Sequence, residues 1–476
     1  MSDSVALQSL RESLGDRVHT DEESLYRNSF DGMRLAFAHE ADIQIDHPDQ
    51  IGEVLRLANQ YKVPVTTRGA GTSLTGSASP ARGGWVLRLD QLNDIRIDPL
   101  NQFAHVGPGA VVNDLQNAAK KEGLFYPPDP SSVRYCTIGG NIACNAGGMR
   151  CLKYGVTRDY VVALQGYLPT GELVSWSTNT KKFATGYNIR DLWIGSEGTL
   201  GIVTSATLKL IPAPQKTWSL LAAFPSEREA LTAVASIISK RIGPAILEFL
   251  DRPSVRGAEA ACNQPIFEGM PGRSLLLIQL DGSEGVVAEA REQLLAWAEA
   301  EAEAFRPAPT PEAAEELWNI RRACSSAMFE LGDSKLNEDV VVPIHRQADL
   351  IDEVERIRQK YQIAIAVFGH AGDGNLHVNI MHHRGDPAES KRAREGLGEL
   401  MQSVVNLGGA ISGEHGVGLA KSPFLDLQLG PAEIAIMRKI KDTFDPNGIL
   451  NPGKLFEPYE VWNKKKEIYR FPWDHR

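Results

Sequence analysis

Two short segments in the second half of the chain carry residues that suit metal chemistry. In "IAIAVFGHAGDGNLHVNI", a Gly-Asp-Gly-Asn turn between two apolar runs predicts a hairpin over 363–380. Alternation puts His377 and Asn379 on one face, and cross-strand spacing brings His370 within about 5 Å of His377. Two adjacent imidazoles can chelate a metal ion, and Glu414 in "GGAISGEHGVGLAK" could complete a His-His-Glu set with an open position. The alternative is that both histidines only form hydrogen bonds in a core.

Three glycine-rich and hydroxyl-rich segments in the first half of the chain suit an anionic ligand. They are "VTTRGAGTSLTG" at 65–76, "PPDPSSVRYCTIGGNIACNAGGMRCLKYG" at 127–155 and "IGSEGTLGIVTSATL" at 194–208. Glycine lets the backbone approach a ligand closely, while N–H groups and hydroxyls donate to phosphate oxygens. The glycines of the first segment, at 69, 71 and 76, match neither the dinucleotide fingerprint nor the phosphate-binding P-loop. Together they could line a groove for a ligand with phosphates and flat polar rings, although the first alone is equally typical of a surface loop.

A predicted helix in the second half offers a side chain that binds anions. In "ELWNIRRACSSAM", helical spacing puts Arg321 and Ser325 on one face. The planar fork of an arginine matches a carboxylate with two parallel hydrogen bonds. The alternative is a solvated arginine that touches no ligand.

More than one domain must position these residues, because the chain has 476 residues. Short β-branched runs broken by turns predict an α+β domain in the first 215 residues. From about 216 to 425, apolar strands alternate with long helical stretches, which predicts an antiparallel sheet covered by helices. Within this part, "AWAEAEAEAFRPAPTPEAAEE" predicts a solvated helix followed by a linker. The tail "PAEIAIMRKIKDTFDPNGILNPGKLF" predicts a helix that stops at Asp-Pro-Asn-Gly.

Composition excludes several classes of protein. Hydrophobic residues make up 42% and charged residues 23%, as in ordinary globular proteins, and the net charge of −10 argues against a general nucleic-acid binder. We expect a cytoplasmic protein, because the acidic N-terminal segment lacks the layout of a secretion signal and no transmembrane run is present. Five cysteines in this spacing predict small core thiols rather than disulfides, a zinc site or an iron–sulfur cluster.

Four motifs in chain order resemble one superfamily: "RGAGTSLTG", "DPSSVRYCTIGGNIACNAGG", "GSEGTLGIVT" and "DPNGILNPGK". They are similar to FAD-binding oxidoreductases of the vanillyl-alcohol oxidase type, which have a PCMH-type FAD domain. Within it the chain resembles the D-2-hydroxyacid dehydrogenase branch, which includes D-lactate dehydrogenases, D-2-hydroxyglutarate dehydrogenases and the flavin subunit of glycolate oxidase. The resemblance covers about 20–460. It implies an α+β FAD domain of two subdomains over 1–215 (core about 38–214), a substrate or cap domain over 216–425, and a helical segment over 426–476 that returns to the flavin.

The same resemblance implies how FAD is held. The first glycine-rich loop would wrap the pyrophosphate, the second segment would follow the flavin and reach the adenosine side, and the third would hold the ribose and adenine. Some superfamily members tether FAD through a histidine in the first loop, and 66–76 contains none, so we expect noncovalent FAD. The implied FAD-binding residues are Arg68, Gly69, Ala70, Gly71, Thr72, Ser73, Pro128, Ser132, Thr137, Gly140, Asn141, Asn145, Gly147, Gly148, Gly155, Glu197, Gly201, Ile202, Val203 and Asn451.

The resemblance also implies the chemistry of the second domain. In the family, the residues that match His370, His377 and Glu414 bind a divalent ion, and the residue that matches His415 is the base. Mixed nitrogen and oxygen ligands suit Zn²⁺ or Mn²⁺. The sequence therefore predicts a metal centre and a catalytic histidine adjacent to one of its ligands.

Substrate recognition is implied by a Trp-x-x-Arg match, which makes Arg321 the expected partner of the substrate carboxylate. We also expect Ser325 and Asn379 to contact the substrate. One departure concerns a lysine that hydroxyglutarate enzymes carry shortly before a strand. Here "KLNEDVVVP" has Asn337 at the nearest position and Lys335 two residues earlier, which puts recognition of a second carboxylate in doubt.

The expected function is an FAD-dependent dehydrogenase that oxidises a D-2-hydroxyacid of the D-lactate, D-2-hydroxyglutarate or glycolate class to the 2-oxoacid. Electrons would pass to an external acceptor, which is a quinone, a cytochrome or an electron-transfer protein. Two alternatives stay open: a non-catalytic flavoprotein subunit of a glycolate-oxidase-like complex, and a transferase like alkyl-glycerone-phosphate synthase. The sequence also leaves open a homodimer and a peripheral association with the inner face of the membrane.

Overall fold

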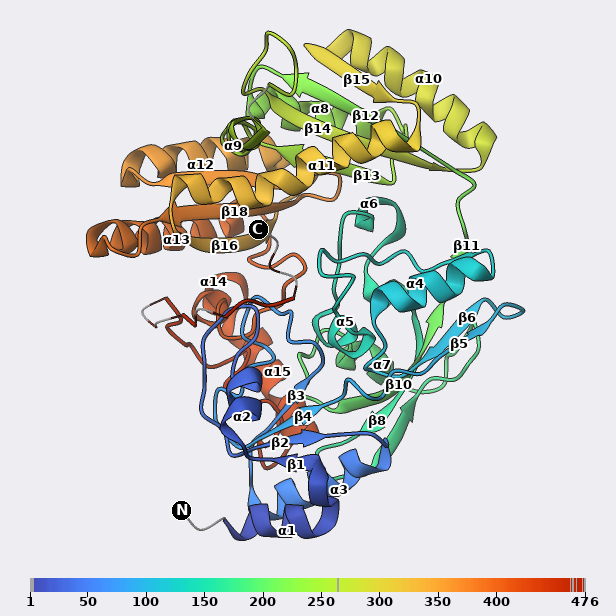
Figure 1. The fold of residues 1–476 in the computed structure, drawn as a ribbon, viewed down its shortest axis with the longest axis vertical. Helices are drawn as coiled ribbons and strands as arrows, with labels where there is room; N and C mark the ends of the chain where they lie inside the picture. Colours follow the sequence, from blue (N-terminus) through green and yellow to red (C-terminus); the bar gives the residue numbers. More distant parts are fainter. Residues whose placement is uncertain are drawn as a thin grey trace. The chain divides into compact units, whose positions relative to one another are not determined.

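The computed structural model describes residues 4–262, 265–462, 464, 466–467, 469–472 and 474 (Figure 1). The chain forms two compact units. Unit 1 spans Met1–Gly147, Val156–Ala213 and Glu414–Asp474, and unit 2 spans Gly148–Gly155 and Pro214–Gly413. Both units combine helices with sheets, which confirms the predicted α+β class.

Unit 1 contains a four-stranded sheet in the order β1-β2-β4-β3. Strands β2, β4 and β3 run parallel, because the helix α3 (Asp49–Tyr61) crosses over between β2 and β3. Helix α3 buries Ile51, Val54 and Leu55 in the core of this sheet. The surrounding elements are α1 (Val5–Leu14), β1 (Val18–His19), α2 (Glu22–Asn28), β2 (Ala41–Gln44), β3 (Val65–Arg68) and β4 (Trp85–Arg88).

The second sheet of unit 1 has five antiparallel strands in the order β5-β6-β10-β8-β9. A short pair, β7 with β11, lies outside it. The elements are β5 (Ile95–Asp98), β6 (Phe103–Val106), α4 (Val112–Lys121), β7 (Leu124–Phe125), α5 (Ile138–Cys144), β8 (Val161–Tyr167), β9 (Leu173–Trp176), α7 (Ile189–Trp193), β10 (Ile202–Lys209) and β11 (Ile211–Pro212).

The C-terminal segment of the chain completes unit 1. It contains α14 (Leu425–Gln428) and α15 (Pro431–Phe444), and α15 ends where the Asp-Pro-Asn-Gly turn was expected. The Asp445 carboxylate accepts a hydrogen bond from Ile449 N at 3.0 Å, which holds this turn. Leu450 then forms a parallel bridge with Val65 of β3, so the tail returns to the start of the first glycine-rich loop.

Unit 2 is built on a seven-stranded sheet in the order β15-β12-β14-β13-β17-β18-β16. Every neighbouring pair is antiparallel, which confirms the sheet type expected from the sequence. The strands are β12 (Lys216–Phe224), β13 (Ile246–Leu250), β14 (Ser274–Gly282), β15 (Ala304–Ala308), β16 (Ser334–Val341), β17 (Ala364–His370) and β18 (Asn375–His382).

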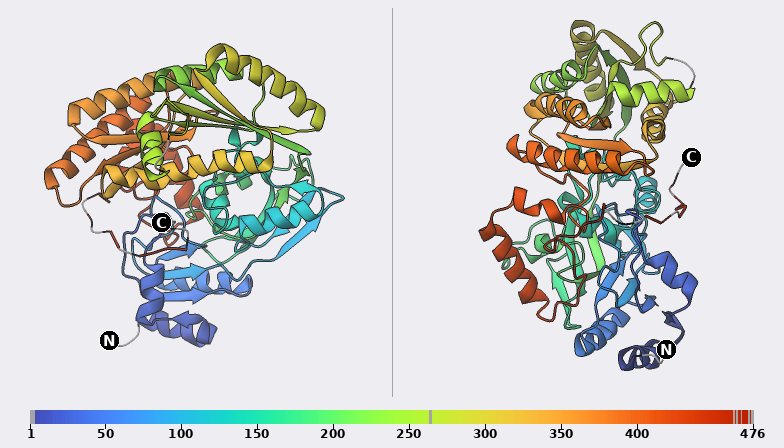
Figure 2. Two further views of the ribbon diagram at one scale, coloured as in Figure 1. Left: turned by 45° about the horizontal axis from the view of Figure 1, so that its top comes forward. Right: turned by 90° about the vertical axis from the view of Figure 1, so that its left-hand side faces the viewer.

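Helices cover both faces of this sheet (Figure 2). One face packs against α9 and α11, around Leu221, Leu250 and Leu277. The remaining long helices pack on the other side and contact the strands there. The helices of unit 2 are α6 (Cys151–Tyr154), α8 (Glu227–Ser239), α9 (Arg252–Cys262), α10 (Glu284–Glu301), α11 (Pro311–Ala327), α12 (Gln347–Tyr361) and α13 (Pro387–Asn406).

The sequence predicted a linker after α10, and part of this prediction is wrong. Residues Ala304–Ala308 form the strand β15, which pairs with β12 at the edge of the sheet. Pro307 lies within it, and an edge strand tolerates proline because one side of its backbone has no partner strand. The prolines that indicated a linker are therefore compatible with the edge of a sheet.

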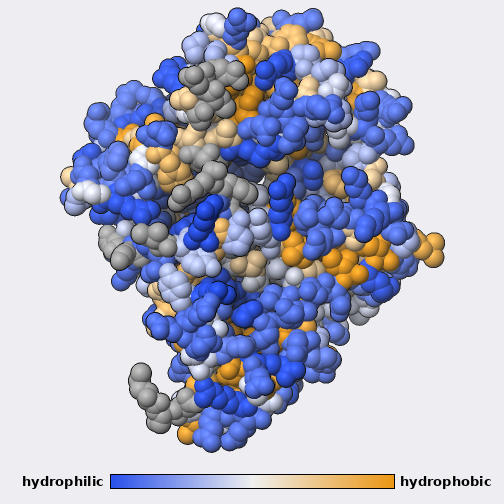
Figure 3. Space-filling view, viewed as in Figure 1, coloured by the Kyte–Doolittle hydropathy of each residue, from blue (hydrophilic) through white to orange (hydrophobic). Residues whose placement is uncertain are grey.

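The surface of the described chain is mostly polar, as the face in Figure 3 shows. Exposed large apolar side chains such as Leu100 and Tyr187 occur on it. None of the described helices has the length and apolar character that would let it cross a membrane.

Candidate active site

The first glycine-rich loop of unit 1 leaves the carboxyl end of β3 and is supported by a buried arginine. Arg68 donates from Nη1 to Phe30 O at 2.8 Å, and its side chain fills the space beneath Gly71. A Cβ at Gly71 would lie 2.2 Å from Arg68 Nη2, and the φ of Gly71 is +72°, so this position needs glycine. The Arg68 side chain therefore supports the loop from below and leaves ligand contacts to the backbone.

The three glycine-rich segments meet inside unit 1. A Cβ at Gly69 would lie 2.3 Å from Thr137 Oγ1, which brings the first loop against the start of α5. Gly195 N donates to Ile142 O at 2.9 Å, and Glu197 N donates to Ala143 O at 2.8 Å. Segments separated by about 60 residues each along the chain thus pack against one another, which gathers the three glycine-rich backbones in one place.

Two buried polar atoms at these segments fit a polar ligand. Thr67 Oγ1 in β3 and Asn141 Nδ2 in α5 have no hydrogen-bond partner among the described residues. Buried polar groups are normally paired, so an unpaired amide donor beside the loops favours a ligand with acceptor atoms. The residues present therefore fit an FAD molecule, whose phosphates and ring carbonyls accept hydrogen bonds.

Asn451 ties the loops together from the C-terminal segment. Its Nδ2 donates to Ser77 O at 2.8 Å and to Glu197 O at 2.7 Å. Its Oδ1 accepts from Lys454 Nζ at 3.1 Å. The side chain, expected to reach the flavin, is thus engaged with the backbone of two glycine-rich segments.

Glu197 lies where the third segment meets the loop that carries His415. Its carboxylate accepts from Val417 N at 2.7 Å, Gly418 N at 2.9 Å and Ser77 Oγ at 2.8 Å. Burial raises the pKa of Glu197, although these donors act in the opposite direction. Thr75 Oγ1 also donates to His415 O at 3.3 Å. The predicted base is therefore anchored on both sides by segments predicted to bind FAD, and the sequence pattern gave no sign of this role for Glu197.

The other predicted FAD-binding residues of unit 1 lie in or beside these segments, and Ile202 is buried at the start of β10. Gly148 and Gly155 bound the short segment that belongs to unit 2. The residues of unit 1 in this group are Ala70, Thr72, Ser73, Pro128, Ser132, Gly140, Asn145, Gly147, Gly201, Ile202 and Val203.

Three of the five cysteines, Cys136, Cys144 and Cys151, lie within the second glycine-rich segment and form no disulfide. Burial raises the pKa of Cys136 to about 11. The side chains of Cys262 and Cys324 lie outside the described residues.

In unit 2, the predicted hairpin brings its two histidines together. Strands β17 and β18 pair so that Phe368 faces His377 and His370 faces Asn375. The imidazoles of His370 and His377 are diagonal neighbours, with ring centroids 5.1 Å apart and planes at 87°. Both side chains are buried, so the sheet presents two ring systems from one face in a sheltered position.

A carboxylate that sequence reasoning missed joins this pair to the predicted anion-binding arginine. His370 Nδ1 lies 2.5 Å from Glu248 Oε1, and Arg321 Nε donates to Glu248 Oε2 at 2.7 Å. Burial alone would raise the pKa of Glu248, but the facing His370 and Arg321 lower it to about 2. In the sequence, Glu248 is visible only as the one charged residue of the apolar run "AILEFL".

Arg321 is held on α11 in a fixed plane. Its guanidinium lies over the Phe368 ring, with Cζ 4.4 Å from the ring centroid, and its side chain is 13% exposed. Within the described part of the chain, Nε has a hydrogen-bond acceptor and neither Nη atom donates to one. The terminal fork is therefore available to a carboxylate.

Asn379 lies on the same face of β18 as His377 and is completely buried. Its Nδ2 donates to Ala366 O at 3.3 Å and to His377 O at 3.0 Å, and Oδ1 has no partner among the described residues. The Ser325 side chain lies outside the described residues.

Strand β16 lies next to β18 and carries the residues that departed from the hydroxyglutarate pattern. Asn337 faces Asn379, and Lys335 faces Met381 at a greater distance from the histidines. Lys335 Nζ lies 5.7 Å from the centroid of the Phe329 ring. Both side chains belong to the face that carries His377, and their contribution to substrate choice stays a prediction.

Glu414 is the first residue of the segment that returns to unit 1, so chain connectivity limits its position. The preceding Gly413 donates from N to Asp339 Oδ2 at 2.9 Å, and Asp339 faces His377 across the β16–β18 pair. Adjacent Cα atoms are about 3.8 Å apart, which keeps the Glu414 backbone near this anchor. His415 Nε2 lies 3.8 Å from Glu414 Oε1.

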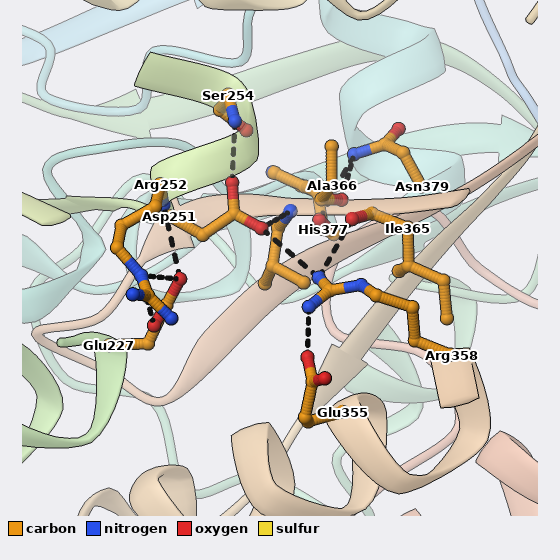
Figure 4. A network of polar contacts seen from close by, with 11 residues as sticks. Glu227, Asp251, Arg252, Ser254, Glu355, Arg358, Ile365, Ala366, His377 and Asn379 are labelled. Carbon is orange, nitrogen blue, oxygen red and sulfur yellow. Dashed lines mark hydrogen bonds and ion pairs between the residues drawn. The ribbon is translucent and has the colours of Figure 1, made fainter. Parts of the chain in front are cut away.

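A second buried carboxylate, Asp251, links the beginning of α9 to β17 (Figure 4). Its Oδ1 accepts from Ser254 N at 2.8 Å, and its Oδ2 accepts from Val367 N at 2.6 Å. Arg358 Nη2 lies 3.9 Å from Oδ2. Burial raises the pKa of Asp251 to about 7, although the hydrogen bonds and Arg358 act in the opposite direction.

We expect Asp251 to make the protein less stable as the pH rises from about 5 to 8. Its pKa of about 7 exceeds the ordinary value of 3.8, so the folded state binds the proton more tightly than the unfolded state. The resulting stabilisation is complete below the unfolded pKa and is lost as the pH rises through the folded pKa. Its size is on the order of a few kcal/mol. Urea unfolding of Asp251→Asn should show a weaker pH dependence, whereas the exposed control Asp352→Asn should match wild type. Equal pH dependence in wild type and Asp251→Asn would contradict this.

Comparisons with known proteins place both halves of the chain in one group. Residues 40–177 match the family described as "FAD binding domain", and residues 213–455 match "FAD linked oxidases, C-terminal domain". Glycolate oxidase subunit GlcD of Bacillus subtilis is 40% identical over 412 residues, 86% of this chain and 87% of that protein. D-lactate dehydrogenase of Anaerostipes hadrus is 37% identical over 425 residues, 87% of this chain and 88% of that protein.

Solved structures share the fold at low sequence identity. p-Cresol methylhydroxylase with substrate bound matches with a TM-score of 0.79 at 17% identity, over 95% of this chain and 96% of that chain. Alkyldihydroxyacetonephosphate synthase matches with a TM-score of 0.74 at 19% identity, over 95% of this chain and 86% of that chain. These likenesses confirm the PCMH-type architecture expected from the motifs.

Proposed function

Because the chain belongs to the FAD-linked oxidases, with PCMH-type architecture and relatives in the hydroxyacid class, we propose that it oxidises a D-2-hydroxyacid to the 2-oxoacid. The observation that carries this proposal is the face of unit 2 on which a histidine pair lies near Arg321, whose two Nη atoms donate to no acceptor among the described residues. A 2-hydroxyacid has two groups that match this face, a carboxylate and a hydroxyl.

Each residue has a distinct task in the proposed reaction. The Arg321 fork binds the substrate carboxylate and orients the molecule. An unprotonated ring nitrogen of His415 takes the hydroxyl proton. FAD supplies the hydride acceptor when it is bound. The C2–H bond breaks with its electron pair, the C2–O bond becomes a carbonyl, and an external quinone, cytochrome or electron-transfer protein later receives the two electrons.

We expect the FAD to be held noncovalently, since residues 66–76 contain no histidine that could form a bond to the flavin. The close approach of Gly69 to Thr137 and the hydrogen bond from Glu197 N to Ala143 O support a preformed site for its phosphates. Asn141 supplies a buried donor without a partner among the described residues.

We further propose a divalent ion, Zn²⁺ or Mn²⁺, bound by His370, His377 and Glu414. The adjacent imidazoles support it, and covalent continuity through Gly413 keeps the Glu414 carboxylate within reach of the same face. An ion there would supply a Lewis acid and a template for the hydroxyl oxygen. Nitrogen and oxygen donors fit both metals, so the donor set does not choose between them.

Removal of the ion should abolish flavin reduction by substrate and leave the flavin absorption spectrum nearly unchanged. The reason is that none of the three proposed ligands lies in a glycine-rich segment predicted to bind FAD: His370 and His377 lie on β17 and β18, and Glu414 directly follows Gly413. The measurement is flavin reduction after chelator treatment, with elemental analysis of the same sample and re-addition of Zn²⁺ or Mn²⁺. Full activity in protein shown to be metal-free would contradict the proposed ion.

An anaerobic screen tests the proposed substrate class. The purified flavoprotein is mixed with D-lactate, glycolate or D-2-hydroxyglutarate, and bleaching of the oxidised flavin is followed. Reduction by at least one of them supports the proposal and ranks the substrates. A flavin that none of them reduces would favour a non-catalytic subunit or a transferase.

A further inference from the structure

Glu248 occupies an unusual position for a carboxylate. It lies in the middle of β13, whose residues Ile246–Leu250 are all buried, and it is completely buried itself. The antiparallel register places it opposite Leu277 of β14. A buried charge in apolar surroundings is strongly unfavourable unless it is paired and hydrogen-bonded, so the partners of Glu248 decide what it does.

Those partners come from two different elements, and each engages one carboxylate oxygen. Oε1 lies 2.5 Å from Nδ1 of His370, at the end of β17. Oε2 accepts from Nε of Arg321, on α11, at 2.7 Å. One carboxylate therefore connects a proposed metal ligand with the proposed carboxylate-binding arginine.

The first contact determines how His370 presents its ring. An ionised carboxylate only accepts hydrogen bonds, so Nδ1 of His370 is the donor. The other nitrogen, Nε2, is then the ring atom that would bind a metal ion. Hydrogen bonds of this kind fix the tautomer and the orientation of histidines that bind metals.

The second contact determines how Arg321 presents its fork. Glu248 engages Nε, and the ring of Phe368 lies against the guanidinium plane at 4.4 Å. With Nε and the plane both held, neither Nη group donates to an acceptor among the described residues. The Nη pair is therefore oriented and available for a carboxylate, which an arginine can bind with two hydrogen bonds.

We propose that Glu248 is a positioning residue that orients the metal-binding His370 and the substrate-binding Arg321 together. It touches neither substrate nor cofactor and acts through these two side chains. The proposal rests on the proposed function, because it assigns Glu248 to that same site. Loss of the Glu248 charge should therefore weaken both the binding of a metal ion by His370 and the binding of the substrate carboxylate by Arg321.

A purely structural ion pair is the alternative, and unit 2 contains a matched example. Glu227 is buried and accepts from Arg252 Nε with both oxygens at 2.9 Å. Glu227→Gln thus reports the effect of removing a buried carboxylate charge from the same unit. Glu248→Gln preserves shape and removes the charge, and Glu248→Asp keeps the charge on a shorter side chain.

The test uses the full-length FAD-loaded protein and two binding readouts. Zinc affinity is measured by competition with a chromogenic chelator, and affinity for the substrate analogue oxamate by perturbation of the flavin spectrum. We expect Glu248→Gln to weaken zinc binding by about 10- to 100-fold and oxamate binding by about tenfold or more. Glu248→Asp should recover part of the zinc affinity and part of the oxamate affinity. Glu227→Gln should change neither affinity.

Zinc and oxamate affinities of Glu248→Gln within about twofold of wild type would overturn the proposal, as would equal losses in Glu227→Gln. Loss of thermal stability in both glutamine variants, with binding lost only in Glu248→Gln, supports it. If the proposed metal site itself does not exist, the wild-type protein will bind no zinc. This result differs from failure of the Glu248 proposal, in which the wild type binds zinc and Glu248→Gln binds it equally well. When the wild type binds no zinc, oxamate binding decides the proposal through Arg321 alone.

Discussion

Replacing His415 with asparagine is expected to slow flavin reduction by about 10²- to 10⁴-fold and to leave substrate affinity close to wild type. The amide of asparagine approximates the size of the imidazole but cannot accept a proton near neutral pH. The base is needed only as the hydroxyl proton leaves, whereas Arg321 acts on the bound substrate as well. The backbone at this position is held by Thr75, and the following residues by Glu197, so the variant should keep its local structure.

Stopped-flow mixing under anaerobic conditions measures this effect, because the flavin signal separates binding from reduction. His345→Asn is the matched control, since His345 is an exposed histidine of unit 2. A His415→Asn rate within about threefold of wild type would mean that another group takes the proton.

Replacing Arg321 with alanine is expected to weaken substrate binding by about 10²-fold or more, since a charge-assisted contact with two hydrogen bonds is worth about 3 kcal/mol or more. Part of the effect will come from Glu248, which loses one of its two partners and stays buried. Arg321→Lys keeps the charge but not the planar fork, so it should fall between wild type and alanine.

The measurement is the dissociation constant for substrate, obtained from the concentration dependence of flavin reduction. Arg322→Ala is the control, because the neighbouring Arg322 is exposed and pairs with Glu315. An unchanged dissociation constant in Arg321→Ala would remove the arginine from substrate binding. His415→Asn and Arg321→Ala should therefore fail differently, the first in rate and the second in affinity.

Local patterns in the sequence predicted the parts of the fold that depend on neighbours along the chain. The hairpin of β17 and β18 followed from strict alternation around a glycine-rich turn, and it brought His370 and His377 to one face. The glycine-rich loops were visible because their backbone conformation needs glycine at positions such as Gly71. The antiparallel sheet of unit 2 followed from strands that alternate with long amphipathic helices.

Contacts between distant parts of the chain could not be predicted in this way. Glu248 meets a histidine 122 positions later, and one charged residue in an apolar strand does not indicate its partner. Glu197 was expected to hold a ribose, yet its carboxylate engages the backbone of a segment 220 residues away. Strand β15 was missed because its proline, Pro307, is acceptable only at a sheet edge, which the local sequence does not reveal.

The central claim is that hydride leaves C2 of a D-2-hydroxyacid for the flavin of this chain. The most direct measurement is an anaerobic single turnover with the D and L enantiomers of the fastest chiral substrate, in which reduced flavin and 2-oxoacid are quantified together. We predict one 2-oxoacid per reduced flavin with the D enantiomer and no reduction with the L enantiomer. Protein loaded with FAD and metal that is not reduced by the D enantiomer, or that is reduced without forming the 2-oxoacid, would contradict the claim.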